Sequence, residues 1–141
     1  MFRRLTGKTK IMYFLAAAST AFTKGDLVYF DGSGNVIPAD STSGSHVGVI
    51  QKDIASTDSD YASTKMVPVE VPVEKWVEWE VSANGTAVAA DVGLEIDLTD
   101  AANANRAASS KDALLVTRFI SSTKLAVVIC SMADNHWTAT T

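Results

Sequence analysis

The chain has 141 residues, 47% of them hydrophobic and 20% charged, with a formal net charge of −4. This length and hydrophobic fraction predict one folded domain with its own core and exclude a globally disordered chain. The mild acidity argues against a body that binds nucleic acid directly. Cys130 is the only cysteine, which excludes a disulfide within the chain, and its apolar neighbours predict a buried side chain rather than a nucleophile.

The charges are segregated along the sequence. The first 25 residues carry five bases and no acid, whereas all sixteen acids lie at or beyond Asp26. We therefore expect two parts, a basic leading segment and an acidic body. Two interpretations of the leading segment are open: a solvated tail, or a tether to an acidic surface of another molecule. Its bases are Arg3, Arg4, Lys8, Lys10 and Lys24.

An apolar run follows the first four of these bases, from Ile11 to Ala18. The order of basic, apolar and small residues imitates a secretory signal peptide, but the run is much shorter than the roughly 20 residues that span a bilayer. Residues 11–15 are β-prone and either dock as an added strand on a neighbouring molecule or supply the first strand of this chain's own barrel. We divide the chain into an N-terminal arm at residues 1–22, a β-rich body at residues 23–132 and a C-terminal tail at residues 133–141.

The body begins with short strands separated by turns. Residues 27–30 are β-prone and end in the turn-forming cluster 31–35, after which residues 36–37 resume a strand that Pro38 ends. Residues 46–50 predict a third short strand, with polar loops before and after it.

The strongest pattern runs from Val67 to Val81. Its odd positions are mostly apolar and its even positions mostly acidic, which predicts a half-buried strand with one apolar face. The pattern is longer than the usual strand, so we expect a break near Glu74. Pro68 and Pro72 lack ladder donors, and they predict that the first half is an edge strand or a bent one.

The remaining elements are short. Residues 87–91 predict one helical turn, residues 94–98 an alternating strand, and residues 101–112 either a loop or a short helix. Residues 114–120 and 124–132 predict a hairpin whose second strand is apolar on both faces and therefore central. The expected fold class is all-β: a small single-domain barrel or sandwich with an extended N-terminal arm and a short C-terminal tail.

Few residues have the pattern of a catalytic or metal site. His46 and His136 each lack a neighbouring ligand at metal spacing. Glu78 and Glu80 share a strand face, as the two carboxylates of a glycosidase can, but no other site feature follows them and a solvated acidic face is the favoured interpretation. We therefore expect no catalytic residue, no cofactor and no metal, and keep a hydrolase that uses Glu78 or Glu80 as a less favoured alternative.

Several turn-and-strand motifs resemble those of a known family. They are Ala21-Phe-Thr-Lys-Gly-Asp-Leu-Val28, Gly34-Asn-Val-Ile-Pro-Ala39, Val47-Gly-Val49 with the acidic-serine loop after it, Ala89-Ala-Asp-Val-Gly93, Asp97-Leu-Thr-Asp100 and the closing hairpin. Over residues 16–132 the chain is similar to the small capsid decoration, or cement, proteins of tailed bacteriophages.

The resemblance implies a β-rich, non-enzymatic protein on the outer surface of the virion capsid, where it ties neighbouring subunits of the major capsid protein together. It also implies a homo-oligomer, with a trimer favoured, that contacts neither nucleic acid nor membrane. The bases of the arm would then pair with capsid carboxylates, and exposed tryptophans are typical of interfaces. The expected capsid or subunit contacts are Arg3, Arg4, Lys8, Lys10, Ile11, Tyr13, Phe14, Trp76 and Trp137.

The alternative is a secreted β-rich binding module, for example for carbohydrate. In that interpretation the leading segment is a cleaved signal, and Trp76, Trp79 and Tyr61 are the side chains that stack on a sugar.

Overall fold

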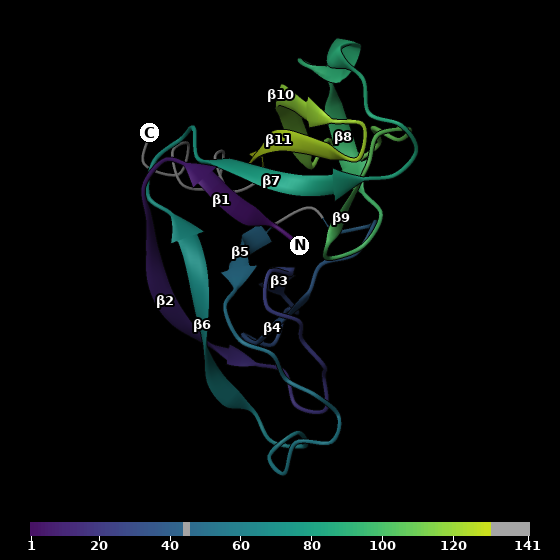
Figure 1. Cartoon of the computed structure of the whole chain (residues 1–141). Coiled ribbons are helices and arrows are strands. Elements are labelled where there is room, and N and C mark those ends of the chain that lie inside the picture. The colour runs from purple at the N-terminus through teal and green to yellow at the C-terminus, as the bar shows by residue number, and fades with distance from the viewer. Residues whose placement is uncertain (44–45, 131–141) are drawn as a thin grey trace.

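A computed structural model of the chain describes residues 1–43 and 46–130 (Figure 1). These residues fold almost entirely into short strands and turns, which confirms the all-β class. The elements are β1 (Arg3–Thr6), β2 (Thr9–Ala16), β3 (Leu27–Phe30), β4 (Val36–Pro38), β5 (His46–Ile50), β6 (Lys65–Pro72), β7 (Glu78–Ala83), the 3-10 turn η1 (Ala89–Asp91), β8 (Glu95–Leu98), β9 (Asn103–Asn105), β10 (Leu114–Ser121) and β11 (Lys124–Ile129).

The strands are divided between a six-stranded sheet and a closed barrel. The sheet has the order β1-β7-β11-β10-β8-β9, and a parallel pairing of β9 with β7 joins its far end back to β7. The barrel closes in the order β2-β4-β3-β5-β6. In Figure 1 the sheet occupies the upper part of the molecule and the barrel the lower part.

The N-terminal residues belong to both units. β1 pairs with β7 at the edge of the sheet, and β2 pairs with β6 over eight residue pairs, from Thr9 opposite Pro72 to Ala16 opposite Lys65. The expectation of a separate arm at residues 1–22 is therefore wrong, and the open alternative, a strand of this chain's own barrel, is confirmed. The physical reason is the period-two pattern of residues 9–16, whose inward side chains complete the barrel interior.

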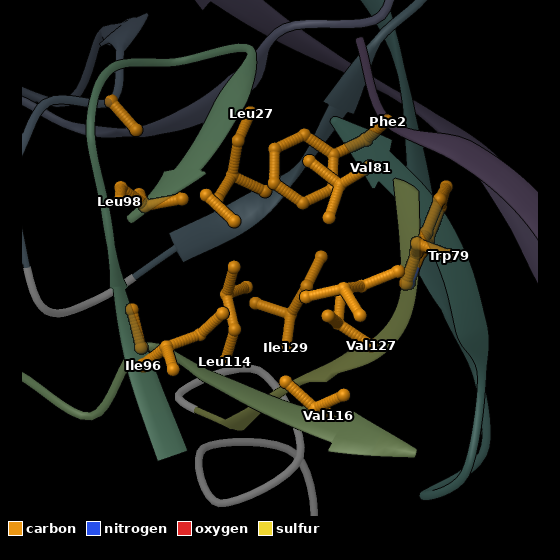
Figure 2. Packing of buried hydrophobic residues seen from close by; sticks show 14 of the residues in the cluster. Phe2, Leu27, Trp79, Val81, Ile96, Leu98, Leu114, Val116, Val127 and Ile129 are labelled. Atoms are coloured by element: carbon orange, nitrogen blue, oxygen red, sulfur yellow. The ribbon is translucent and has the colours of Figure 1, made fainter. Parts of the chain in front are cut away.

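Two clusters of buried side chains hold the units together. The larger lies between the sheet and the neighbouring side of the barrel, and Phe2, only 2% exposed, packs into it beside Leu27 and Val81 (Figure 2). The second fills the barrel, where Met12 and Phe14 pack against the buried residues of β3 to β6. Because the N-terminal segment contributes to both clusters, it is part of the core of the fold.

The long alternating segment is two strands, as expected. β6 ends at Pro72 and β7 begins at Glu78, so the predicted break is confirmed. The prediction of an edge strand is wrong, because β6 lies between β2 and β5. The prolines are tolerated there because β5 pairs only with Val69 and Glu70, which leaves both Pro68 and Pro72 outside that ladder.

The last third of the body follows the prediction with two exceptions. The helical turn is present as η1, and β11 is central, between β7 and β10. Residues 101–112 contain β9 rather than only a loop or a helix. Pairing with β7 and β8 and burial of Ala104 override the weak strand propensity of its asparagines. Cys130 is half-buried rather than buried, because it follows the last residue of β11.

We expect Phe2→Ala to lower the free energy of unfolding by about 3–5 kcal/mol, the usual cost of removing a buried phenylalanine ring. The matched variant Tyr13→Ala removes an aromatic ring that is 61% exposed, and it should change stability by less than about 1 kcal/mol. Urea unfolding of the two variants measures both values. Equal, small effects would mean that residue 2 does not belong to the core.

His46 predicts a pH dependence of stability. The imidazole is buried and lies 3.1 Å from the Ser43 hydroxyl, and burial lowers its pKa from 6.5 to about 4 despite the opposing charge of Asp40. Between pH 6.5 and 4 the unfolded chain therefore binds a proton that the folded chain does not, so stability falls as the pH falls, by about 2–3 kcal/mol.

The His46→Gln variant should lose most of this dependence between pH 6.5 and 4. The carboxylates of Glu78, Glu80 and Asp91 have lowered pKa values, so their contribution is lost only below about pH 4.5 and is separable. Urea unfolding at several pH values measures both profiles. Parallel profiles for wild type and variant between pH 6.5 and 4 would contradict the assignment.

Candidate functional site

The outer side of β2 and β6 is an exposed apolar surface. Strand side chains alternate, so the odd residues of β2 point away from the barrel interior, and Ile11, Tyr13 and Leu15 are 50%, 61% and 42% exposed. Across the ladder Tyr13 lies opposite Pro68, and Leu15 lies opposite Met66, which is 55% exposed. We call these five residues the β2–β6 face.

Two turns meet at one end of the β2–β6 face. The N–H of Val73 donates to the Lys8 carbonyl (3.0 Å), and the N–H of Lys8 donates to Oε1 of Glu74 (2.8 Å). Gly7 has a φ of +97°, and a Cβ there would lie 2.8 Å from Cα of Val77. Only glycine therefore permits the β1–β2 turn to approach residues 73–77 this closely.

This end carries an exposed tryptophan and three lysines, which we call the basic corner. Trp76 is 64% exposed on the connection between β6 and β7. Lys8, Lys10 and Lys75 are also exposed, and none of the three forms an ion pair with the residues that the structure describes. The exposed carboxylate of Glu74 lies among these lysines, so the three positive charges are only partly offset. A net positive charge at one end of an apolar surface suits a partner that is apolar and acidic.

The two arginines of β1 are paired within the chain. Arg3 Nη2 lies 2.9 Å from Glu80 Oε2, and Arg4 Nε lies 2.8 Å from Glu70 Oε2. The Arg3 pair follows from register, because β1 lies beside β7 with Arg3 opposite Glu80 and the outward side chains of opposite charge meet across the strands. Both arginines stay partly exposed, so their contact with another molecule remains a prediction.

The carboxylates of β7 are likewise occupied by groups of this chain. Glu78 accepts hydrogen bonds from the hydroxyls of Thr117 (2.6 Å) and Thr6 (3.0 Å) and pairs with Arg118 (3.2 Å). The Thr117 hydrogen bond is the main cause of the lowered pKa of Glu78, and the Arg3 hydrogen bond lowers the pKa of Glu80. A general acid needs a raised pKa, so the geometry does not favour a hydrolase that uses these two residues.

The other predicted site residues are distributed differently. Phe14 is half-buried against the barrel core, with its ring 5.5 Å from that of Phe30 and edge-on to it, so it lies on the opposite side of β2 from Ile11 and Tyr13, and its contact with another molecule remains a prediction. Trp79 is 1% exposed, which removes it from the sugar-stacking set, and the Tyr61 hydroxyl donates to the Ser19 carbonyl. Trp137, His136 and the tail at residues 133–141 lie outside the described residues.

Sequence reasoning left three members of the β2–β6 face out of the expected contacts: Leu15, Pro68 and Met66. The signal for Leu15 was present, because it continues the odd positions of Ile11 and Tyr13. Met66 had no such signal, because it precedes the alternating segment and is placed on the face only by the register of β6 against β2.

Comparison of the sequence with protein-family models and with curated proteins finds no match. Within residues 1–43 and 46–130, no three or more side chains of the metal-binding types come together as a metal site would require. No helix in the same ranges has the length and hydropathy needed to cross a membrane. The most distinctive chemistry of the described surface is therefore the β2–β6 face with its basic corner.

Glu78 is predicted to act structurally. Glu78→Ala should lower the free energy of unfolding by about 1–2 kcal/mol, because the half-buried Thr117 hydroxyl loses the shorter of its two hydrogen bonds, keeping only the 3.2 Å bond to the Ala126 carbonyl, and Arg118 loses its partner. Glu95→Ala is the matched control, since the Glu95 side chain is exposed and forms no hydrogen bond or ion pair within the described residues; the substitution should change stability by less than about 0.5 kcal/mol. Chemical unfolding of both variants checks this, and a neutral Glu78→Ala would refute it.

Proposed function

We propose that this chain is a non-enzymatic decoration protein of a tailed-bacteriophage head, which binds the outside of the capsid and stabilises contacts between major capsid protein subunits. The observation that carries the proposal is the β2–β6 face, an apolar surface on ordered strands with Trp76 and three lysines at one end. The motif resemblance between residues 16 and 132 supplies the identity of the partner.

A surface built on paired strands is suited to permanent attachment. Ile11, Tyr13 and Leu15 are held by a ladder that is complete without a partner, so little backbone order has to be gained on binding. Tyrosine and tryptophan are enriched among residues whose truncation weakens interfaces most, and Tyr13 and Trp76 are the two most exposed large side chains of the surface. Where many linked copies bind one shell, each copy that stays bound raises the effective concentration of its neighbours at the surface.

The basic corner adds a preference for an acidic partner. Lys8, Lys10 and Lys75 form no ion pair with a carboxylate of the described residues. Exposed lysines contribute to the rate and specificity of association more than to affinity, and their contribution weakens with salt. Attachment is therefore expected to be apolar in its main part and moderately dependent on salt.

A secreted carbohydrate-binding module is less well supported. Removal of about 20 residues as a signal would delete β1 and β2, which pair with β7 and β6, and would take Phe2 out of the core. The three proposed stacking side chains also share no surface, because Trp79 is buried.

Point substitutions test the attachment, since truncation would remove two strands. Tyr13→Ser should weaken binding to purified heads that lack the protein by at least about tenfold, because a large exposed ring is lost from the centre of the face, while the unfolding midpoint stays close to that of wild type. Cosedimentation with heads measures occupancy. Wild-type occupancy by a folded Tyr13→Ser protein would reject the β2–β6 face as the attachment surface.

The contribution of the basic corner to attachment is tested by a matched pair of lysine substitutions. Lys75→Glu should reduce occupancy and its salt dependence, whereas Lys111→Glu should leave both unchanged, because Lys111 is also an exposed lysine but lies between β9 and β10, outside the basic corner. Equal effects of the two substitutions would mean that only net charge matters and that the basic corner has no specific role.

A further inference from the structure

One asparagine of the chain is followed by glycine. Asn84 comes directly after β7 and precedes Gly85, and both residues are exposed. Asparagine is a thermally labile residue, because the main-chain nitrogen of the next residue can attack its Cγ. Glycine has no Cβ to hinder that attack, whereas each of the other asparagines precedes a residue with a side chain. On sequence grounds Asn84 is therefore the asparagine most open to this reaction.

The fold holds both ends of the Asn84 side-chain amide. The Arg106 N–H donates to Oδ1 (2.9 Å), and Nδ2 donates to Oδ1 of Asn105 (3.0 Å). Asn105 Oδ1 also accepts the Ala107 N–H (3.1 Å), so this atom is fixed as an acceptor. The two main-chain donors thus determine the orientation of both amides, and Asn84 has to present a donor to Asn105.

These hydrogen bonds act on the two ends of the reaction differently. The attacking Gly85 nitrogen is not held, because its N–H forms no hydrogen bond within residues 1–43 and 46–130. The Arg106 N–H would favour the negative charge that develops on Oδ1 during the attack. Nδ2 is the leaving nitrogen, and it cannot depart without breaking its bond to Asn105. Restraint of the reaction is therefore assigned to Asn105.

The reaction needs no reagent other than water. The Gly85 nitrogen forms a bond to Cγ of Asn84 and gives up its proton to solvent. The bond from Cγ to Nδ2 breaks, and this nitrogen takes a proton from solvent and leaves as ammonia. Water then opens the cyclic succinimide at either of its carbonyls, which gives aspartate or isoaspartate with one new carboxylate.

We propose that Asn84 is a deamidation site, that its hydrogen bond to Asn105 restrains the reaction in the folded chain, and that the reaction loosens β9 from β7. In the product a carboxylate oxygen replaces Nδ2 and faces Asn105 Oδ1. Because the Ala107 N–H fixes that atom as an acceptor, two acceptors then meet with no proton between them.

The pairing of β9 with β7 is short enough for this loss to matter. β9 has three residues, and it pairs with β7 only at Ser82–Asn103 and Ala83–Ala104 (Figure 1). The N–H of Asn84 continues this pairing through its bond to the Ala104 carbonyl (3.1 Å). Isoaspartate in addition lengthens the main chain directly after this N–H. Deamidation thus acts at the point where the end of the sheet is joined back to β7.

The rate of deamidation tests the restraint. The purified full-length chain is incubated in mildly alkaline buffer, and peptide mapping by mass spectrometry follows conversion at residue 84. Folded wild type should convert at least about tenfold more slowly than the same chain unfolded in guanidinium chloride. Asn105→Ala should convert at least about fivefold faster than folded wild type, because the leaving nitrogen is no longer held.

Glu78→Ala is the matched control for this rate, since it lowers overall stability without touching the Asn84 hydrogen bonds, and it should convert as slowly as wild type. Equal acceleration by Glu78→Ala and Asn105→Ala would assign the protection to global stability and overturn the proposal. A folded wild type that converts as fast as the unfolded chain would overturn it as well.

The Asn84→Asp variant tests the consequence of the reaction directly. In hydrogen exchange, the protection factor of the residue-84 N–H should fall at least about fivefold, while the amides of β11, between β7 and β10, should keep their protection. Unchanged protection at residue 84 would overturn the proposal. Both measurements use the chain alone, so their outcome is independent of attachment to a phage head.

Discussion

The chain crosses between the six-stranded sheet and the barrel twice, and the architecture depends on the contact between these two crossings. β1 and β7 lie in the six-stranded sheet, β2 and β6 lie in the barrel, and the turn at Gly7 crosses beside residues 73–77. The Arg4–Glu70 ion pair joins a sheet strand to a barrel strand at this crossing. Because both crossings occur at one corner, the N-terminal residues complete both units: β1 pairs with β7 at the edge of the sheet, and β2 pairs with β6 in the wall of the barrel.

Folding also redistributes the charge that the sequence segregates. The acidic positions of β6 and β7 face outward, but Arg3, Arg4 and Lys124 pair with Glu80 and Glu70, so much of that face is neutralised internally. Lys8, Lys10 and Lys75 form no ion pair within the described residues, although the exposed carboxylate of Glu74 lies among them and accepts a hydrogen bond from the Lys8 N–H.

Period-two alternation made much of the fold predictable. It gave the strands before and after the break at residues 73–77, the buried face that includes Trp79, and the central position of β11. Alternation does not determine the register, that is, which residues of neighbouring strands lie opposite each other. The pairings Arg3 with Glu80 and Leu15 with Met66 depend on which strands become neighbours, so sequence reasoning assigned the arginines to another molecule and missed Met66. β9 was missed for the same reason, since its strand state comes from pairing with β7.

The long ladder between β2 and β6 gives the molecule a direction of mechanical strength. Eight residue pairs run along one axis, and a force that pulls the two strands in opposite senses along that axis must rupture their hydrogen bonds together. A force at right angles to the axis would open them one after another, at much lower load. The wall formed by β2 and β6 is thus stiffer along its strands than across them.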